Sequence, residues 1–159
     1  MGVSLSKAKE RANYIVKELE PFCDKIEVVG SVRREKDEVK DIDILLAPKT
    51  LTLFEMMNHM VKLGASNSKI ESKKTLWSGG CNVELWITSL DRWPVMLLIR
   101  TGGEKSNKRI AELCKQKKWH LSVSEGAILD ENGKKFPVNS EEDVYKLLGI
   151  NYLEPKERE

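Results

Sequence analysis

Several features that mark secreted, membrane-spanning or zinc-binding proteins are scarce or missing in this sequence. Its 159 residues include only three cysteines, Cys23, Cys81 and Cys114, which are far apart and form no Cys-x-x-Cys pair. Neither a disulfide framework nor a zinc site is therefore expected. No apolar run approaches the ~20 residues of a membrane span, and positions 1–10 lack the apolar block of a secretory signal. These absences predict a cytoplasmic protein in a reducing compartment, with no membrane partner.

A strong excess of one charge is also missing, since the formal net charge at pH 7 is only +2. Bulk charge therefore does not indicate a nucleic-acid partner, but the charge is unevenly distributed. Positions 100–120 hold seven Lys and Arg residues against two Glu residues, and a second basic cluster consists of Lys69, Lys73 and Lys74. A solvated surface is the ordinary explanation for such clusters. They gain significance only beside a site that handles phosphate groups.

Hydrophobic residues make up 40% of the chain and charged residues 33%, which is typical of a globular protein with a packed core. Apolar residues three and four positions apart predict helices over 4–20, 51–63, 90–100, 104–118 and 140–148, the last with a capping box of Ser140 and Asp143. Short apolar runs predict strands over 26–30, 42–47, 72–77, 83–87, 120–123, 127–129 and 135–138. The pattern predicts an α+β fold, with a small sheet and covering helices in residues 1–90 and a small α/β subdomain in residues 91–159.

The sequence predicts a candidate site for phosphate and metal binding between positions 30 and 43. Gly30 and Ser31 end a predicted strand, Arg34 follows, and Asp41 and Asp43 lie on the next strand. Alternate strand residues share a face, so the two carboxylates lie side by side and repel each other unless a cation lies between them. Mg²⁺ prefers such oxygen ligands, and an arginine fork suits phosphate oxygens. An Asp-x-Asp pair alone would more simply be a solvent-facing strand, but the combination favours a metal–phosphate site.

This combination resembles a known signature. The run from Gly30 to Arg34 followed by Asp41-Ile42-Asp43 is similar to that of nucleotidyltransferases related to DNA polymerase beta, and more narrowly to DNA polymerase family X. Thr101-Gly102-Gly103 with Asn107 resembles the motif that closes over the incoming nucleotide. The tail at 152–158 is similar to the family's C-terminal Tyr-x-Glu-Pro-Lys-Asp/Glu-Arg. The resemblance implies a nucleotidyltransferase palm, a small mixed sheet with covering helices, in residues 1–90 and a thumb in residues 91–159.

A two-metal nucleotidyl transfer is what this resemblance implies for the chemistry. The family has a third carboxylate on a neighbouring strand, and Glu84 occupies the matching position, although the family uses aspartate there. Asp41, Asp43 and Glu84 would hold one Mg²⁺ that lowers the pKa of a primer 3′-hydroxyl. Asp41 and Asp43 would hold a second that binds the triphosphate, and Mn²⁺ is the alternative metal. Glu84 has a simpler explanation as a surface residue on an alternating strand.

The resemblance also implies a set of nucleotide contacts. Its members are Gly30, Ser31, Arg34, Ile99, Arg100, Thr101, Gly102, Gly103 and Asn107, of which Ser31 and Arg34 would hold the β- and γ-phosphates. Ile99 and Arg100 replace a family Tyr-Phe pair that helps to exclude a ribose 2′-hydroxyl, so we hypothesise weak discrimination between dNTP and NTP. Gly103 replaces the family's serine, and a cis peptide is expected between Gly102 and Gly103.

The implied function is a template-directed DNA polymerase of repair type that adds dNMP to a primer 3′-OH in short gaps. Its partners would be gapped or primer–template DNA and a dNTP. Because the first motif begins at residue 30, the chain resembles the reduced palm-plus-thumb polymerases known from viruses, and a monomer is expected. The DNA contacts would then come from Lys69, Lys73, Lys74, Lys105, Lys108 and Arg109.

Two other functions stay open at this point. One is a template-independent or non-DNA nucleotidyltransferase, against which the thumb-like half and the C-terminal motif argue. The other is a catalytically weakened DNA-binding homologue, which the replacement of aspartate by Glu84 favours. Retention of Asp41, Asp43 and the Gly-Ser-x-Arg-Arg run argues against it.

Overall fold

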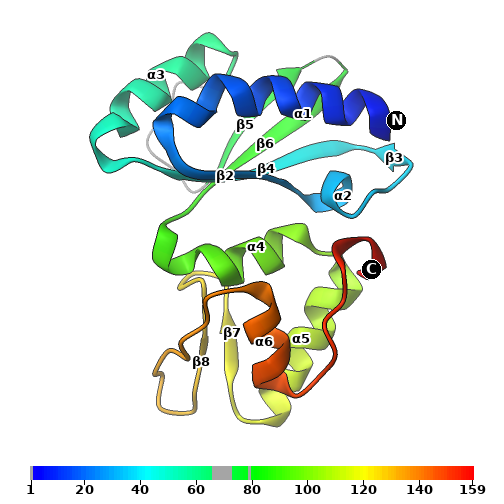
Figure 1. The fold of residues 1–159 in the computed structure, drawn as a ribbon, viewed down its shortest axis with the longest axis vertical. Coiled ribbons are helices and arrows are strands. Elements are labelled where there is room, and N and C mark those ends of the chain that lie inside the picture. Colours follow the sequence, from blue (N-terminus) through cyan, green and yellow to red (C-terminus); the bar gives the residue numbers. More distant parts are fainter. Residues whose placement is uncertain (1, 66–72, 79) are drawn as a thin grey trace.

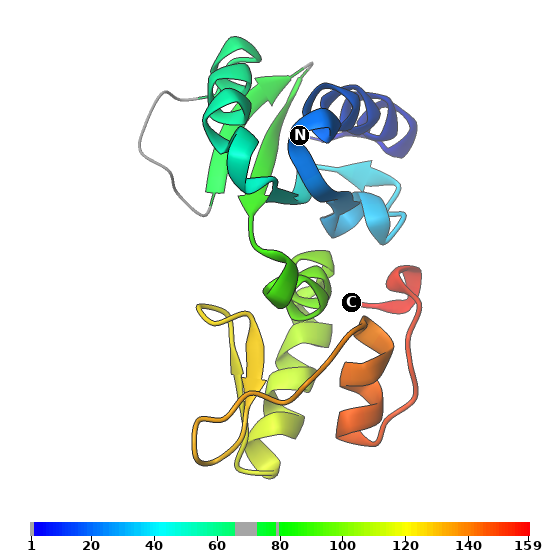
Figure 2. The ribbon, with the colours of Figure 1, turned by 60° about the vertical axis from the view of Figure 1, so that its left-hand side comes forward.

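The computed structural model of the chain describes residues 2–65, 73–78 and 80–159. The first half forms a helix-covered sheet, and the second half forms a smaller group of helices with a short hairpin (Figure 1). Helix α4 (Trp93–Thr101) lies between these two parts, as a second view also shows (Figure 2). The arrangement confirms the predicted α+β fold class.

The central sheet has four strands in the order β2-β4-β6-β5. Their bounds are β2 (Cys23–Val29), β4 (Asp41–Pro48), β6 (Cys81–Ile87) and β5 (Lys73–Ser78). β4 pairs antiparallel with β2 and parallel with β6, while β5 and β6 are antiparallel, so the sheet is mixed as expected. The parallel β4–β6 pair brings two distant sequence segments side by side.

Two helices, α1 (Leu5–Leu19) and α3 (Leu53–Lys62), cover one face of this sheet (Figure 1). The Ser4 hydroxyl caps α1 by accepting a hydrogen bond from the amide of Lys7. A ribbon of β1 (Val3–Ser4) and β3 (Glu38–Val39) joins the start of α1 to the segment before β4. These contacts confirm the helices predicted over 4–20 and 51–63, with slightly shorter bounds.

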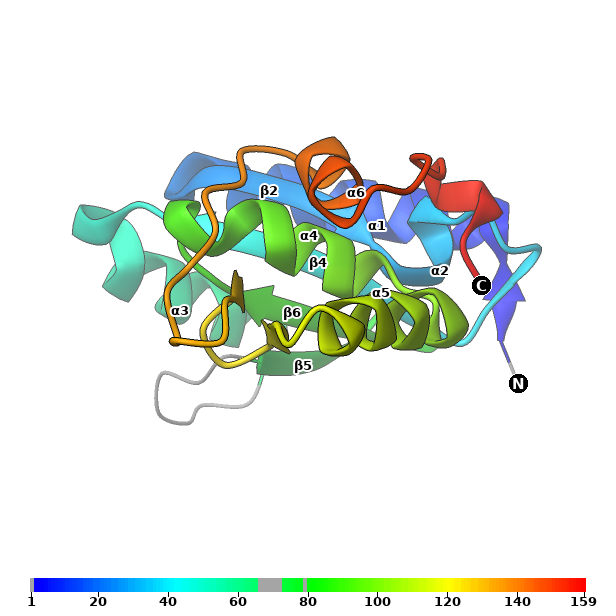
Figure 3. The ribbon, with the colours of Figure 1, turned by 90° about the horizontal axis from the view of Figure 1, so that it is seen from below.

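Side chains on β4 alternate between the two faces of the sheet. Ile42 and Ile44 belong to the apolar cluster under α1 and α3, whereas Leu45 belongs to the cluster on the α4 side. All three are fully buried, and burial of each contributes about 1.5–3 kcal/mol. Because strand residues two apart share a face, Asp41 and Asp43 lie on the same side as Leu45. In the view from below, α4 lies in front of β2 and β4 and so covers this side of the sheet (Figure 3).

The second half has its own apolar cluster, to which α4, α5 (Glu104–Gln116) and α6 (Glu141–Leu148) contribute. β7 (His120–Ser122) and β8 (Ala127–Leu129) pair antiparallel. Pro94 stands in the first turn of α4, where the missing amide hydrogen costs nothing. Four short 3₁₀ turns complete the described chain, at Glu20–Phe22, Thr50–Thr52, Leu90–Arg92 and Pro155–Glu157.

The cap of α6 has one predicted hydrogen bond and one that differs. The Ser140 hydroxyl accepts from the Asp143 amide, as the capping box requires. The Asp143 carboxylate, however, accepts from the amide of Asn139 and not from that of Ser140. The return bond of the box therefore lies one residue earlier in the chain.

The strand predicted over 135–138 is wrong. Lys135 makes an isolated bridge to Leu129, and no strand follows it. Pro137 explains the difference, because it lacks the amide hydrogen with which a strand residue pairs in a ladder. The segment instead leads into α6.

Within residues 2–65, 73–78 and 80–159, no helix combines the length and the apolar character that a membrane crossing requires. The longest, α1, has 15 residues and carries several charged side chains. A bilayer-spanning helix needs about 20 predominantly apolar residues.

Candidate active site

The three predicted carboxylates lie on adjacent strands. Asp41 and Asp43 lie at the start of β4, and Glu84 lies on β6 with its Cα opposite that of Asp43. The same register places Asp43 opposite Val29, the last residue of β2, so the Gly30 turn follows directly beside it. Asp43 and Glu84 are half-buried and Asp41 is exposed. The parallel pairing of β4 with β6 is what gathers residues 41, 43 and 84.

Asp43 has a defined contact at each carboxylate oxygen. The indole Nε1–H of Trp86 donates a hydrogen bond of 3.0 Å to Oδ1. Oδ2 lies so close to Gly30 that a β-carbon there would overlap it, and Gly30 has a positive φ of 61°. Burial raises the pKa of Asp43 to about 6, with the charges of Glu84 and Asp41 adding to the effect and the Trp86 hydrogen bond opposing it. A cation beside Asp43 would offset this cost of ionisation.

Glu84 has a basic partner on the neighbouring strand. The Lys73 ammonium lies 3.3 Å from Glu84 Oε1. Lys73 and Glu84 are on the same face of the sheet, whereas Lys74 is directed to the other face and is only 2% exposed. The burial of Lys74 removes it from the candidates for a direct phosphate contact, because alternation on β5 sends neighbouring lysines to opposite sides. Lys69, the third member of that cluster, lies outside the described residues.

The segment after β2 forms the single-turn helix α2 (Gly30–Arg33) and ends at Arg34. Arg34 Nη1 donates a hydrogen bond of 2.5 Å to the carbonyl oxygen of Thr101, and its Nε is buried with no partner among the described residues. Burial lowers the pKa of Arg34, and the charge of Asp43 opposes that shift. Arg34 thus joins the Gly30 turn to the Thr101 segment, which the sequence predicted as two parts of one nucleotide site.

The end of α4 and the start of α5 hold the remaining predicted nucleotide contacts. Asn107 Nδ2 donates to the carbonyl oxygen of Ile99 over 2.9 Å, which ties the two helices together. The peptide between Gly102 and Gly103 is cis, as expected from the sequence. The Ile99 side chain packs in apolar clusters. The functional role expected for each of these residues stays a prediction.

Arg100 has an unforeseen partner. Its guanidinium carbon lies 3.6 Å from the ring centroid of Trp86, in a stacked cation–π contact. Burial lowers the pKa of Arg100, while the negative charges of Asp43 and Glu84 oppose the shift. The side chain therefore lies close to the carboxylates as well as on the indole. Nothing in the sequence motifs pointed to Trp86, because indole contacts leave no signature in spacing.

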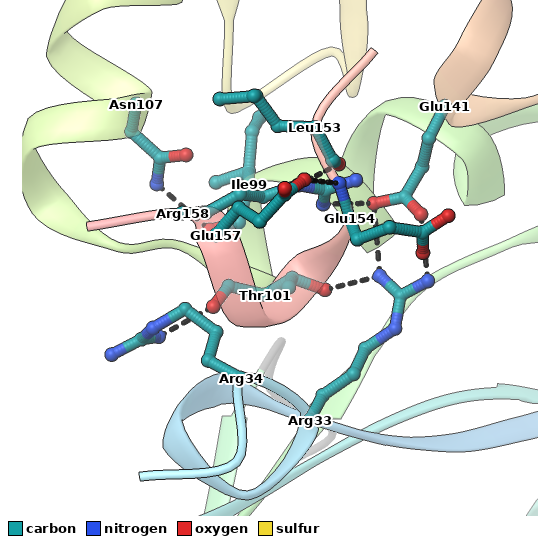
Figure 4. A network of polar contacts seen from close by, with 10 residues as sticks. All are labelled: Arg33, Arg34, Ile99, Thr101, Asn107, Glu141, Leu153, Glu154, Glu157 and Arg158. Carbon is teal, nitrogen blue, oxygen red and sulfur yellow. Dashed lines mark hydrogen bonds and ion pairs between the residues drawn. The ribbon is translucent and has the colours of Figure 1, made fainter.

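A second network that sequence reasoning missed joins the two halves of the molecule (Figure 4). Arg33 forms a two-pronged ion pair with Glu141, with distances of 2.9 and 2.7 Å, and also donates to the Thr101 hydroxyl over 2.6 Å. Arg158 Nη1 lies 2.6 Å from the same Glu141. Arg158 is fully buried, and Glu141 is 4% exposed. Burial alone would raise the pKa of Glu141, but the two guanidinium groups hold it below its usual range.

The predicted DNA contacts on α5 are at the surface. Lys105, Lys108 and Arg109 are exposed, and Lys108 pairs with Glu104 over 2.7 Å within the helix. Lys105 lies 3.7 Å from a carboxylate oxygen of Glu159. Exposed ion pairs of this kind are weak because solvent screens them, so they leave the lysines accessible to phosphate groups.

The donor set at residues 41, 43 and 84 is suited to Mg²⁺ or Mn²⁺, because all its donors are carboxylate oxygens. Across the described ranges 2–65, 73–78 and 80–159, however, no three His, Cys, Asp or Glu side chains are gathered closely enough to form a ready metal site. The geometry gives a reason, since Lys73 engages Glu84 and Trp86 engages Asp43. Lys73 contacts Glu84 through Oε1, so an ion that bound this oxygen would compete with the Lys73 ammonium.

The second half of the chain matches a known family. The DNA polymerase beta thumb family covers residues 96–159. A curated relative, the DNA nucleotidylexotransferase of Xenopus laevis, is 26% identical over 110 residues, which is 69% of this chain and 22% of the relative. The chain thus spans about a fifth of the length of that relative.

The fold has a counterpart among solved structures. The crystal structure of Leishmania infantum polymerase beta, described as a ternary P/T complex, matches with a TM-score of 0.82 and 16% identity. The match covers 100% of this chain and 77% of the other. The chain therefore has the polymerase beta fold. Together, the thumb match of residues 96–159, the curated relative and this fold support a relationship of the chain to family X polymerases.

Proposed function

We propose that the protein is a template-directed DNA polymerase of repair type, which adds dNMP to a primer 3′-OH in short gaps. Residues 1–90 would form the palm and residues 91–159 the thumb. The observation that carries the proposal is the pairing of β4 with β6, which brings Asp41, Asp43 and Glu84 together next to the Gly30 turn. The contact of Arg34 with Thr101 connects this turn to the thumb-family part of the chain.

Each group in the site has a distinct task under this proposal. Asp41, Asp43 and Glu84 would hold two divalent ions, which when bound supply charge neutralisation at the triphosphate and acidification of the primer hydroxyl. Ser31 and Arg34 bind the β- and γ-phosphates, where the planar guanidinium can make paired hydrogen bonds. Gly30 lets the Asp43 carboxylate lie directly against the turn, because a β-carbon at Gly30 would overlap Oδ2.

Partners follow from the same assignment. The incoming dNTP lies between the Gly30 turn and the segment from Thr101 to Asn107. Gapped or primer–template DNA is held through its phosphates by the exposed cations of α5, Lys105, Lys108 and Arg109. Lys73, which is on the Glu84 side of the sheet, would contribute a further phosphate contact to the DNA. Ile99 and Arg100 provide no aromatic pair at the sugar, which supports the hypothesis of weak discrimination between dNTP and NTP.

A template-independent transferase is the second candidate. The observation in its favour is the curated relative, which is named a DNA nucleotidylexotransferase. The geometry of the carboxylates and of the Gly30 turn serves either reaction equally well, because both form the same phosphodiester bond. The two candidates differ in whether a template base selects the nucleotide.

The test is primer extension by the purified protein with each dNTP in Mg²⁺ and in Mn²⁺. The substrates are a one-nucleotide gap and the unpaired primer strand, and the control is the double variant Asp41→Asn/Asp43→Asn. Insertion matched to the template base and lost in the control is the expected result. Equal addition of all four nucleotides to the unpaired primer would establish the second candidate. DNA binding without insertion in either metal would leave a DNA-binding homologue with a weakened site.

A further inference from the structure

Trp86 donates a hydrogen bond to a candidate carboxylate and has no role in the proposed function. It lies on β6 two residues after Glu84, and strand alternation therefore puts both side chains on the α4 side of the sheet. Its indole Nε1–H donates to Asp43 Oδ1 over 3.0 Å across the parallel β4–β6 pair. The ring packs against the apolar cluster of Val29, Leu45, Ala47, Trp93 and Met96.

Two cations hold the indole from the side of the site. The guanidinium of Arg100 is stacked 3.6 Å from the ring centroid, and the ammonium of Lys73 lies 5.1 Å from it. Lys73 is also the ion-pair partner of Glu84. The Trp86 ring is therefore fixed by apolar packing below and by cation–π contacts beside the carboxylates. A ring fixed in this way presents its N–H in one direction only.

The fixed Trp86 ring in turn restricts the orientation of the Asp43 carboxylate. The hydrogen bond at Oδ1 and the closeness of Oδ2 to Gly30 restrict the rotation of the carboxylate. Carboxylates that ligate metals are commonly hydrogen-bonded by a second layer of residues, whose loss costs about 10–100-fold in metal affinity. The indole is neutral, so it can orient the carboxylate without competing with a metal ion for charge.

We propose that Trp86, clamped by Arg100, is a positioning residue that sets the orientation of Asp43 for a divalent ion. This inference rests on the proposed function, since it takes Asp43 as a metal ligand. In this role Trp86 acts through its hydrogen bond to the Asp43 carboxylate. The residue thus extends the site to an aromatic side chain that none of the sequence motifs contains.

The first test follows the indole N–H of Trp86 in the wild-type protein by ¹H–¹⁵N NMR. The chain has four tryptophans, so the spectrum contains four indole resonances, which single Trp→Phe variants assign. Addition of Mg²⁺ is expected to shift the Trp86 resonance, and the variant Asp43→Asn is expected to abolish that shift. If Trp86→Phe does not fold, the variants of the other three tryptophans assign Trp86 by elimination.

The second test measures Mn²⁺ affinity from the EPR signal of the free ion. Trp86→Phe keeps a ring for Arg100 to stack on but removes the N–H donor, and it is expected to weaken Mn²⁺ binding about tenfold or more. Trp119→Phe is the matched control, because Trp119 packs on Phe136 in the second half of the molecule. A urea titration of each variant checks that stability is retained.

The outcomes separate this inference from the proposed function. A wild type that binds no Mn²⁺ would overturn the metal site and this role of Trp86 together. A wild type that binds Mn²⁺, with equal affinity in Trp86→Phe and an indole resonance that does not respond to Mg²⁺, would overturn the role of Trp86 alone. An equal loss of affinity in Trp119→Phe would also contradict it, because the effect would then be general.

Discussion

Asp43 is the residue at which the local contacts of the site converge. One carboxylate oxygen accepts from Trp86, the other lies against Gly30, and burial raises the pKa to about 6. The ionised form is therefore disfavoured in the folded protein by its surroundings and by the charges of Glu84 and Asp41. Any cation that binds beside Asp43 removes this penalty, which favours cation binding at neutral pH.

The variant Asp43→Asn is expected to stabilise the metal-free protein above pH 6. Asparagine keeps an oxygen that can accept from Trp86 but carries no charge. The wild-type carboxyl has a pKa of about 6 when folded and 3.8 when unfolded, so ionisation opposes folding as the pH rises from 4 to 6. The gain at pH 8 should be about 1–3 kcal/mol in the free energy of unfolding and should vanish at pH 4. Urea unfolding in EDTA at both pH values measures it.

Asp41→Asn is the matched control for that measurement, because Asp41 lies two residues earlier on the same strand and is exposed. It should change stability by less than about 0.5 kcal/mol. A gain in Asp43→Asn that persisted at pH 4 would contradict the electrostatic explanation, since no charge is then present to remove.

Gly30→Ala is expected to abolish nucleotide transfer. A β-carbon at this position would overlap Asp43 Oδ2, and the φ of 61° is unfavourable for alanine. Gly149→Ala separates the two effects, because Gly149 has a φ of 69° but open space around it. Primer extension should therefore fall below a hundredth of the wild-type rate in Gly30→Ala and stay near it in Gly149→Ala, while both lose about 1 kcal/mol of stability. Similar rates in both variants would show that the overlap with Asp43 is unimportant.

Helix α5 shows how one element serves two environments. Ile110 and Cys114 are buried in the core of the second half, while Lys105, Lys108 and Arg109 are exposed. Its first turn is also tied to the site, since Asn107 donates to the carbonyl oxygen of Ile99 at the end of α4. A phosphate backbone bound along the exposed side would thus lie next to the candidate nucleotide site.

Charge reversal on this helix is expected to weaken DNA binding without unfolding the protein. The variant Lys105→Glu/Lys108→Glu loses two phosphate contacts. The negative slope of log affinity against log salt concentration should therefore become shallower by about one for each lysine. Fluorescence anisotropy with gapped DNA over a salt series measures this slope. Lys7→Glu/Lys17→Glu on α1 reverses the same number of exposed charges on the sheet's other side. Equal losses in both variants would remove α5 from the interface.

At the scale of the whole molecule, the Glu141 network links the segment after β2, the end of α4, α6 and the C-terminal turn (Figure 4). Arg33 is separated from Glu141 by 108 positions in the sequence. An apolar cluster joins α4 to β2 and β4, and these polar contacts add orientation to that packing of α4 against the sheet. The Glu141 network therefore sets how the candidate phosphate-binding residues of the first half face the second half.

Glu141→Gln is expected to destabilise the fold by about 3–5 kcal/mol, because the fully buried Arg158 is left without a neutralising charge. The midpoint of urea unfolding should fall accordingly. Glu142→Gln removes an exposed charge from the adjacent position of α6 and should be nearly neutral. A stability of Glu141→Gln equal to that of Glu142→Gln would mean that the network contributes geometry but no net stability.

Local patterns were sufficient for the elements and for the principal carboxylates. The spacing of apolar residues identified α1, α3, α4, α5 and α6, and the alternation around Asp41 and Asp43 placed them on one face of β4. These properties depend on residues a few positions apart, which backbone geometry relates directly. The prediction of a strand over 135–138 was wrong because the apolar residues there resemble a strand, while Pro137 prevents strand pairing.

Contacts between distant segments needed the tertiary structure. Period-two alternation separates Lys73 from Lys74, but only the packed helices decide that Lys74 is on the buried side. Trp86 and Asp43 are 43 positions apart, and the register of β4 against β6 brings them within a hydrogen bond. Local sequence patterns are enough to tell which chemical groups lie on which face of each element. Which of these groups come into contact depends on the folded core, because the whole core and not any one segment sets strand register and packing angle.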